Sequence, residues 1–215
     1  MAKARIHGVA ALDRQNWSAD MKKCLALLMV LALAACIDVE DFGPAWDKTF
    51  VDPDIAGSWL RLRPQAADMA HDYPEGQRWI FLDSNSAYSL HTHIDGKKDD
   101  PPVYPVKTLA AGAYRFLASG EWKGPAFAGA IIRYALKDGV LTLYTLNFED
   151  TGKFLEKTYP HAHNIGREPG CRPTAAQDCP VRITRFDDDV LEALAGIPDE
   201  PNYWRAYIKL GRLAN

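Results

Sequence analysis

Several features that mark common classes of protein are missing from this 215-residue chain. There is no basic excess, because 25 Lys and Arg stand against 28 Asp and Glu for a net charge of −3, which argues against a nucleic-acid partner. No Gly-x-Ser-x-Gly, phosphate-binding glycine loop, His-Glu-x-x-His or Cys-x-x-Cys motif is present. The apolar run of residues 25–35 is shorter than the roughly 20 residues that cross a bilayer. We therefore expect no nucleic-acid partner, no cofactor and no enzymatic activity.

The apolar run of residues 25–35 has the form of an export signal. Met21, Lys22 and Lys23 give it a short basic start, and small residues end it just before Cys36. A basic start, a short apolar run and small residues at the end are typical of a cleaved secretory signal. Residues 1–20 mix charges with Trp17 and do not fit such a signal. We expect translation to begin at Met21, with residues 1–20 as an extension foreign to the native protein.

The last four residues of this segment, 33–36 (Leu-Ala-Ala-Cys), resemble the lipobox of bacterial lipoproteins. The resemblance implies that residues 21–35 are a signal peptide and that Cys36 is acylated after cleavage. It also implies a cell-envelope location, at the periplasmic face of the outer membrane, because the residue after the cysteine is Ile37 and not Asp. The membrane would then be contacted through the lipid, since two or more acyl chains hold a protein stably. An ordinary secretory signal, with Cys36 incidental, is one alternative. A buried helix of a cytoplasmic protein is the other, and the two lysines and the abrupt loss of hydrophobicity after Cys36 disfavour it.

The remaining chain divides into an acidic tether over residues 36–54 and one β-rich domain over residues 55–215. In an exported chain, the pair Cys171 and Cys179 is typical of a disulfide bond. A zinc site is the competing interpretation, but two thiols without a second pair nearby make a poor one.

Short β-rich runs predict the architecture of the domain. The Asp-Gly at 138–139 lies between two such runs and predicts a hairpin. One helix is expected after Asp187, ending near Gly196 because Pro198 cannot continue it. No long helices alternate with the strands, so the fold class is mainly β: an antiparallel barrel or a sandwich with one short C-terminal helix. The predicted strands are residues 57–63, 78–82, 87–94, 103–108, 113–118, 129–136, 140–148, 181–186 and 203–210.

The start of the first strand, Gly57-Ser58-Trp59, is similar to the Gly-x-Trp that opens lipocalins and related calycin barrels. In that family the Trp packs across the closed end under a basic residue of the last strand, a part that Arg205 or Lys209 could play here. No Thr-Asp-Tyr-like motif occurs in the middle strands, so the resemblance implies a divergent member. It implies a small apolar ligand inside the barrel, or a structural role in the envelope.

Two His-x-His pairs are the remaining candidates for chemistry. His91 and His93 would lie on one face of a strand and could chelate a metal ion, because residues two apart point the same way. A metal-dependent or hydrolytic periplasmic enzyme using these two histidines is the alternative function. The same strand has an apolar opposite face, which predicts that the histidines face solvent instead, and His161 and His163 follow Pro160 in an expected loop. Six aromatic residues could line an apolar pocket or belong to the core: Trp79, Phe81, Tyr134, Tyr144, Trp204 and Tyr207.

Overall fold

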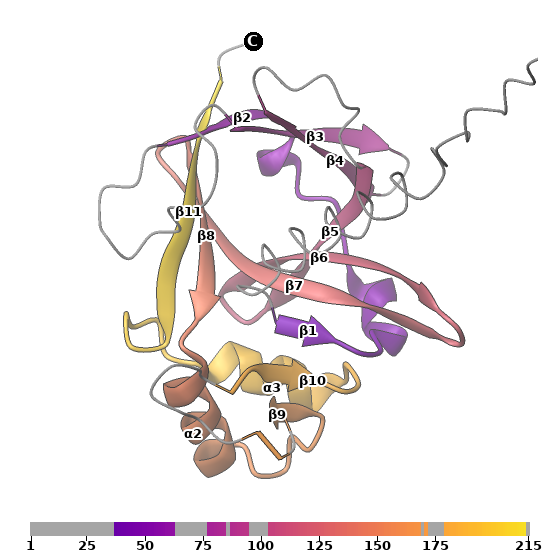
Figure 1. Cartoon of the computed structure of the whole chain (residues 1–215), viewed down its shortest axis with the longest axis vertical. Helices are drawn as coiled ribbons and strands as arrows, with labels where there is room; N and C mark the ends of the chain where they lie inside the picture. The colour runs from indigo at the N-terminus through magenta and orange to yellow at the C-terminus, as the bar shows by residue number, and fades with distance from the viewer. Residues whose placement is uncertain are drawn as a thin grey trace, which may run out of the picture. The chain divides into compact units, whose positions relative to one another are not determined.

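Eight antiparallel strands form a closed barrel (Figure 1). The computed structural model describes residues 37–62, 77–84, 87–94, 103–168, 170–171 and 179–213. Strands β2 to β8 pair in chain order, and β11 joins β8 to β2. The barrel strands are β2 (Gly57–Arg61), β3 (Gln77–Ser84), β4 (Ala87–Ile94), β5 (Val103–Ala111), β6 (Tyr114–Lys123), β7 (Ala126–Lys137), β8 (Val140–Leu146) and β11 (Trp204–Arg212). The mainly β prediction is confirmed, and of its two forms the barrel is the one observed.

The predicted hairpin joins β7 to β8. Asp138 and Gly139 form a two-residue loop with positive φ angles of 52° and 75°. Such loops match the right-handed twist of paired strands, and they favour Asp-Gly because both positions need a left-handed backbone. The register of the barrel is therefore fixed locally at this point.

Strand β7 is the branch point of a single sheet, because it pairs with three other strands. One of its edges pairs with β6 from residue 126 to residue 134, while the other pairs with β8 over residues 133–137 and with β1 over residues 129–131. Beyond β1 the sheet continues through a parallel pairing with β10 and an antiparallel pairing with β9. These three strands are β1 (Ile37–Val39), β9 (Ile165–Arg167) and β10 (Val181–Ile183). The barrel and its extension therefore share a strand.

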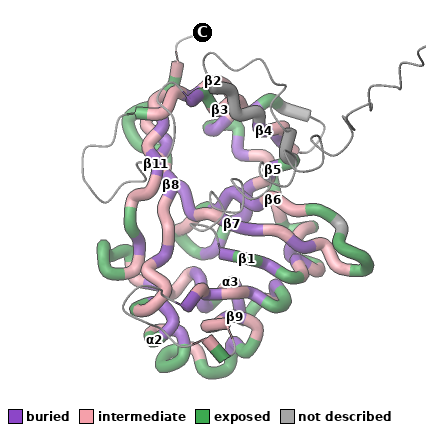
Figure 2. Tube along the Cα trace, viewed as in Figure 1, coloured by how far each residue is buried: buried purple, intermediate pink, exposed green. Residues whose placement is uncertain are grey.

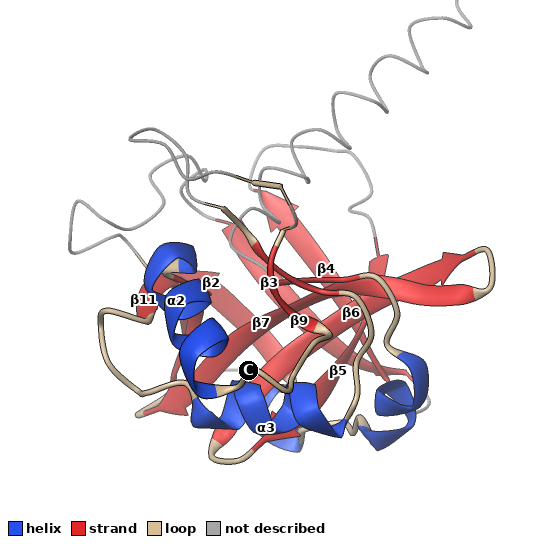
Figure 3. Ribbon diagram, turned by 90° about the horizontal axis from the view of Figure 1, so that it is seen from below, coloured by secondary structure: helices blue, strands red, loops and turns tan. Residues whose placement is uncertain are grey.

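Two α-helices lie in the segment between β8 and β11 (Figure 3). Helix α3 (Asp188–Gly196) is the predicted one: Asp187 caps it by accepting a hydrogen bond from the amide of Val190 at 3.0 Å. Helix α2 (Phe148–Thr158) was not predicted, and it begins at the last residue of the strand expected over residues 140–148. Within the described part of the chain, no helix is both long and apolar enough to cross a membrane.

The buried residues form two separate cores (Figure 2). The inner core lies inside the barrel and consists of Ile55, Trp59, Phe81, Tyr88, Leu90, Val106, Leu117, Tyr134, Leu141, Leu143, Ile208 and Leu210. The outer core lies between the outer face of β5 to β8, the extension strands and the two helices, and includes Ile37, Val39, Phe42, Leu109, Phe116, Ile131, Leu155, Ile183, Val190, Leu194 and Trp204. Alternation along a strand explains this division, because successive residues of β5 and β6 point to opposite faces.

The segment expected to be an acidic tether is part of the fold. Ile37 and Val39 are each 2% exposed in β1, which lies between β7 and β10. Two 3-10 helices follow, η1 (Gly43–Lys48) and η2 (Pro53–Ile55). The acidic and proline residues suggested a solvated linker, but they alternate with apolar side chains that enter both cores. The expected extension, signal peptide and Cys36 lie outside the described residues.

Candidate functional site

The inner face of the barrel is the first candidate site. Backbone register identifies this face, because Trp59 pairs with Trp79 and Phe81 pairs with Leu90 across neighbouring strands. The inner-core side chains on this face are apolar or aromatic, and each is less than 10% exposed. The barrel therefore has an apolar interior to which each of its strands contributes.

The segment from Phe50 to Ile55 crosses and closes one end of the barrel. The backbones of Phe50 and Thr108 exchange hydrogen bonds of 2.8 and 2.7 Å. At the other side of the ring, the indole Nε1 of Trp59 donates to the carbonyl of Ile55 at 2.9 Å. Helix η2 lies within the ring of strands in Figure 1. The end at which β2 begins is thus covered by the chain that precedes it.

Arg212 is the basic residue that covers Trp59. Its guanidinium carbon lies 4.6 Å from the centre of the Trp59 ring, and its Nη2 donates to the carbonyl of Asp54. The prediction of Arg205 or Lys209 for this part was wrong. Arg212 pairs directly with Trp59 in the register between β11 and β2, whereas Lys209 pairs with Thr142 on the opposite face.

A buried carboxylate connects the closing segment to the barrel wall. Asp52 is 2% exposed, and its Oδ2 accepts hydrogen bonds of 2.6 Å from both Arg115 Nη1 and the Tyr134 hydroxyl. Its Oδ1 accepts from the backbone amide of Asp54 at 3.1 Å. The Thr108 hydroxyl lies 3.2 Å from that of Tyr134, and since Tyr134 donates to Asp52, Thr108 donates to Tyr134. Sequence reasoning missed this cluster, which joins four separate segments.

The contacts of Asp52 determine its charge state. Burial alone would raise the pKa of Asp52, but hydrogen bonds from Tyr134, the Asp54 amide and Arg115 together hold that pKa below its ordinary value. The pKa of Tyr134 is raised by burial and by its hydrogen bond to the carboxylate. Asp52 is therefore ionised and Tyr134 protonated at neutral pH. Each buried group has a partner, so the cluster fits a role in holding the barrel closed.

A second buried charge lies outside the barrel. The guanidinium carbon of Arg133 is 4.1 Å from the ring centre of Tyr114 and 4.8 Å from those of both Tyr144 and Trp204. Its Nη2 donates to Asp199 at 2.7 Å, and the residue is 6% exposed. Tyr144 and Trp204 therefore belong to this cage in the outer core, whereas Trp79, Phe81, Tyr134 and Tyr207 belong to or pack against the inner core. The cage attaches the chain before β11 to the barrel wall.

The structure describes the two histidine pairs unequally. The backbones of His91 and His93 pair with Ile80 and Arg78 in β3, while their side chains lie outside the described part of the structure. His161 and His163 are exposed in turns after α2. Among the residues that the structure describes, no group of three or more His, Cys, Asp or Glu side chains is arranged to hold a metal ion.

The predicted cysteine pair is at bonding distance. The sulfur atoms of Cys171 and Cys179 are 2.20 Å apart, and their Cα atoms are 5.7 Å apart. Cys179 is 2% exposed and directly precedes the chain that leads into β10. The bond therefore closes a short loop between β9 and β10.

Removing this disulfide should destabilise the protein modestly. In the chain-entropy view, a loop of this size restricts the unfolded chain by roughly 2–3 kcal/mol. We expect the double variant with Cys171→Ser and Cys179→Ser to lose about that much free energy of unfolding, measured with urea. Thiol labelling of the unfolded, unreduced wild type should leave both positions unmodified. Labelling of both would show that the bond does not form.

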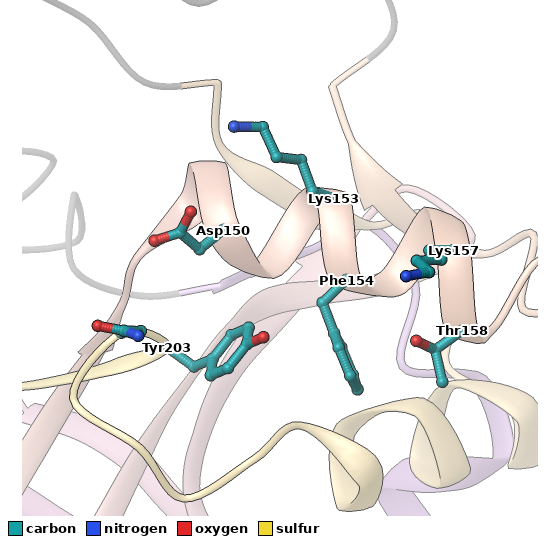
Figure 4. A pocket seen from close by; sticks show the side chains of 7 residues that line it. Asp150, Lys153, Phe154, Lys157, Thr158 and Tyr203 are labelled. Carbon is teal, nitrogen blue, oxygen red and sulfur yellow. The ribbon is translucent and has the colours of Figure 1, made fainter.

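An open groove beside α2 is a weaker candidate (Figure 4). The rings of Phe154 and Tyr203 lie between the helix and the chain before β11, with centres 5.4 Å apart, while Lys153 points away from them. Lys153 forms an ion pair with Glu149 one turn earlier, at 2.6 Å. The lining combines aromatic rings and opposite charges without a recognisable catalytic arrangement. We therefore assign no function to it.

Comparison with known proteins gave no relative. No protein family, no curated protein and no solved structure matches this chain. The assignment of function therefore depends on the sequence signals and on the geometry of the barrel.

Proposed function

We propose that the protein is a bacterial lipoprotein of the cell envelope that holds a small apolar ligand inside its barrel. The observation that carries the proposal is the barrel itself, which has an apolar interior. The end of the barrel at which β2 begins is covered by Ile55, Trp59 and Arg212. A barrel of eight strands is wide enough to enclose side chains or one small ligand. The Gly-x-Trp strand start and the basic residue over the Trp also agree with the lipocalin resemblance.

The envelope location is supported by two features of the chain. The lipobox-like residues 33–36 end a short apolar run behind two lysines. The bonding distance between Cys171 and Cys179 fits an oxidising compartment such as the periplasm. The outer membrane is the proposed destination because Ile37 follows the cysteine.

Substitution of the proposed acylation site should abolish maturation. We expect Cys36→Ser to accumulate as a precursor without fatty acid, since the thiol is the acceptor and cleavage follows acylation. Membrane fractionation and mass spectrometry of the N-terminal peptide measure both effects. Cys24→Ser is the matched control and should mature normally. Normal processing of the Cys36 variant would contradict the lipoprotein assignment.

The ligand is tested separately from the anchor. Native mass spectrometry of gently extracted protein should show one small apolar molecule per chain. A stoichiometric metal ion in place of that molecule would favour the enzyme alternative with His91 and His93. Protein free of both would leave a structural role.

A further inference from the structure

Strand β3 presents two unpaired polar atoms on the inner face of the barrel. Gln77 is the first residue of this strand and is 6% exposed, yet its Oε1 has no hydrogen-bond partner among the described residues. Two residues along, the indole Nε1 of Trp79 is buried and likewise without a partner there. The two residues lie on the same face because side chains alternate along a strand.

Register shows that this face is the inner one. Trp79 pairs with Trp59, and Phe81 lies two residues further on the same face. Both Trp59 and Phe81 belong to the inner core, and Trp79 packs against it. Gln77 and Trp79 therefore face the interior of the barrel beside its apolar side chains. Gln77 lies near the end of β2, away from the closing segment at the start of that strand.

Unpaired buried polar atoms are uncommon in folded proteins, because burial removes their hydrogen bonds to water. The closed end of this barrel follows that rule, since Asp52, Tyr134 and Thr108 are all paired with one another or with Arg115. These polar groups at the closed end of the barrel are thus all hydrogen-bonded. Within the described part of the chain, the acceptor Gln77 Oε1 and the donor Trp79 Nε1 on β3 are not. A ligand that carries both complementary functions would satisfy them.

We propose that Gln77 and Trp79 bind the polar head of a neutral amphiphile whose apolar part lies in the barrel. This inference depends on the proposed function and specifies its ligand class. The head must donate a hydrogen bond to Gln77 Oε1 and accept one from Trp79 Nε1, as a hydroxyl or a primary amide does. An ionised carboxylate fits less well because it has no proton to donate to Oε1.

A pair of matched probes tests the donor requirement. The full chain in amphipol is loaded with N-phenyl-1-naphthylamine, with empty amphipol as the blank, and the dye is displaced by 1-decanol or by decyl methyl ether. The two compounds share an alkyl chain and an acceptor oxygen, but only the alcohol donates a hydrogen bond. In the wild type, we expect the alcohol to displace the dye at about tenfold lower concentration, the value of one net hydrogen bond.

Two variants separate the donor from the acceptor contact. Gln77→Leu should reduce the preference for the alcohol to less than about threefold and leave displacement by the ether unchanged. Trp79→Phe should weaken the binding of both compounds equally, because both accept a hydrogen bond from the indole. Leu82→Ala, at an exposed position of the same strand, is the control and should change neither. Thermal melting of Gln77→Leu should show no loss of stability, because leucine replaces an unpaired polar group.

The outcomes separate this inference from the proposed function. If the dye binds and the wild type does not distinguish the compounds, or Gln77→Leu retains the full preference, the assignment of the polar head is wrong while a ligand-binding barrel stands. If neither the dye nor any alkyl compound binds, both proposals fail.

Discussion

Replacing Asp52 by asparagine is expected to lower the free energy of unfolding at pH 7 by about 3 kcal/mol. The carboxylate is 2% exposed and accepts from Arg115, Tyr134 and the Asp54 amide. An asparagine keeps only one acceptor oxygen. Either the Asp54 amide, or the Tyr134 hydroxyl together with Arg115, then faces an NH₂ donor in place of an acceptor. For a chain of this size the melting temperature should fall by about 6–12 °C. Urea denaturation and thermal melting measure the effect.

The effect of this substitution should depend on pH. The pKa of Asp52 lies below its ordinary value in the folded protein, so the carboxylate stabilises the fold at pH values above the unfolded pKa of roughly 3.9. That contribution is lost as the pH falls through the folded-state pKa. The difference between wild type and Asp52→Asn should therefore be full above about pH 5 and shrink below about pH 4.

Asp54 provides the control for Asp52. It lies in the same turn and is exposed, and it joins the cluster through its backbone amide rather than its side chain. Asp54→Asn should leave the melting temperature within about 2 °C of the wild type, since exposed substitutions change stability little. Equal stability losses in the two variants would show that the buried cluster does not hold the barrel end.

The second large effect is expected for Gly129→Ala. Gly129 lies in β7 between Gly120 of β6 and Val39 of β1. A Cβ at this position would overlap the carbonyl oxygen of Ser119 and lie 2.5 Å from the Cα of Gly120. Both obstacles are backbone atoms, so the strands must separate to accommodate the methyl group. We expect a loss of about 3 kcal/mol, at the upper end of the range for overpacked sites.

Gly166→Ala is the matched control for this clash. Gly166 also lies in a strand, β9, but a Cβ there would have no atom within 4 Å. Its substitution should change stability by no more than about 1 kcal/mol, because only the conformational freedom of the unfolded chain changes. If urea denaturation gives the two alanine variants the same midpoint, the close approach of β6 and β7 is not maintained in solution.

The sequence predicted those parts of the fold that are determined by residues close together in the chain. The Asp-Gly turn at 138–139 and the cap at Asp187 lie next to the elements that they define. Helix α2 also has a local signal, since Asn147 caps it with Glu149 and Asp150 in its first turn. Gly152 in its middle hides that signal, because glycine disfavours helices. Its role appears only in the structure, where the side chain of Arg167 lies against it.

The parts that sequence could not predict depend on distant pairings. Strand β1 is three residues long and exists because residues 129–131 and 181–183 supply its two neighbours. Nothing near Arg212 indicates that it, rather than Lys209, lies opposite Trp59, because the register between β2 and β11 decides this. The same holds for the unpaired atom of Gln77, which depends on the path of the whole barrel.

The position of β1 has a consequence for the timing of biogenesis. A peptidase and an acyltransferase acting at Cys36 need the neighbouring backbone as an accessible, extended substrate. In the finished fold, residues 37–39 are hydrogen-bonded along both edges, and one of these edges is supplied by residues 181–183, which are synthesised late. Under the proposed anchoring, acylation and cleavage must therefore be complete before β10 reaches its place. A mutation that delayed processing would then leave β9, β10 and the outer core without the strand on which they assemble.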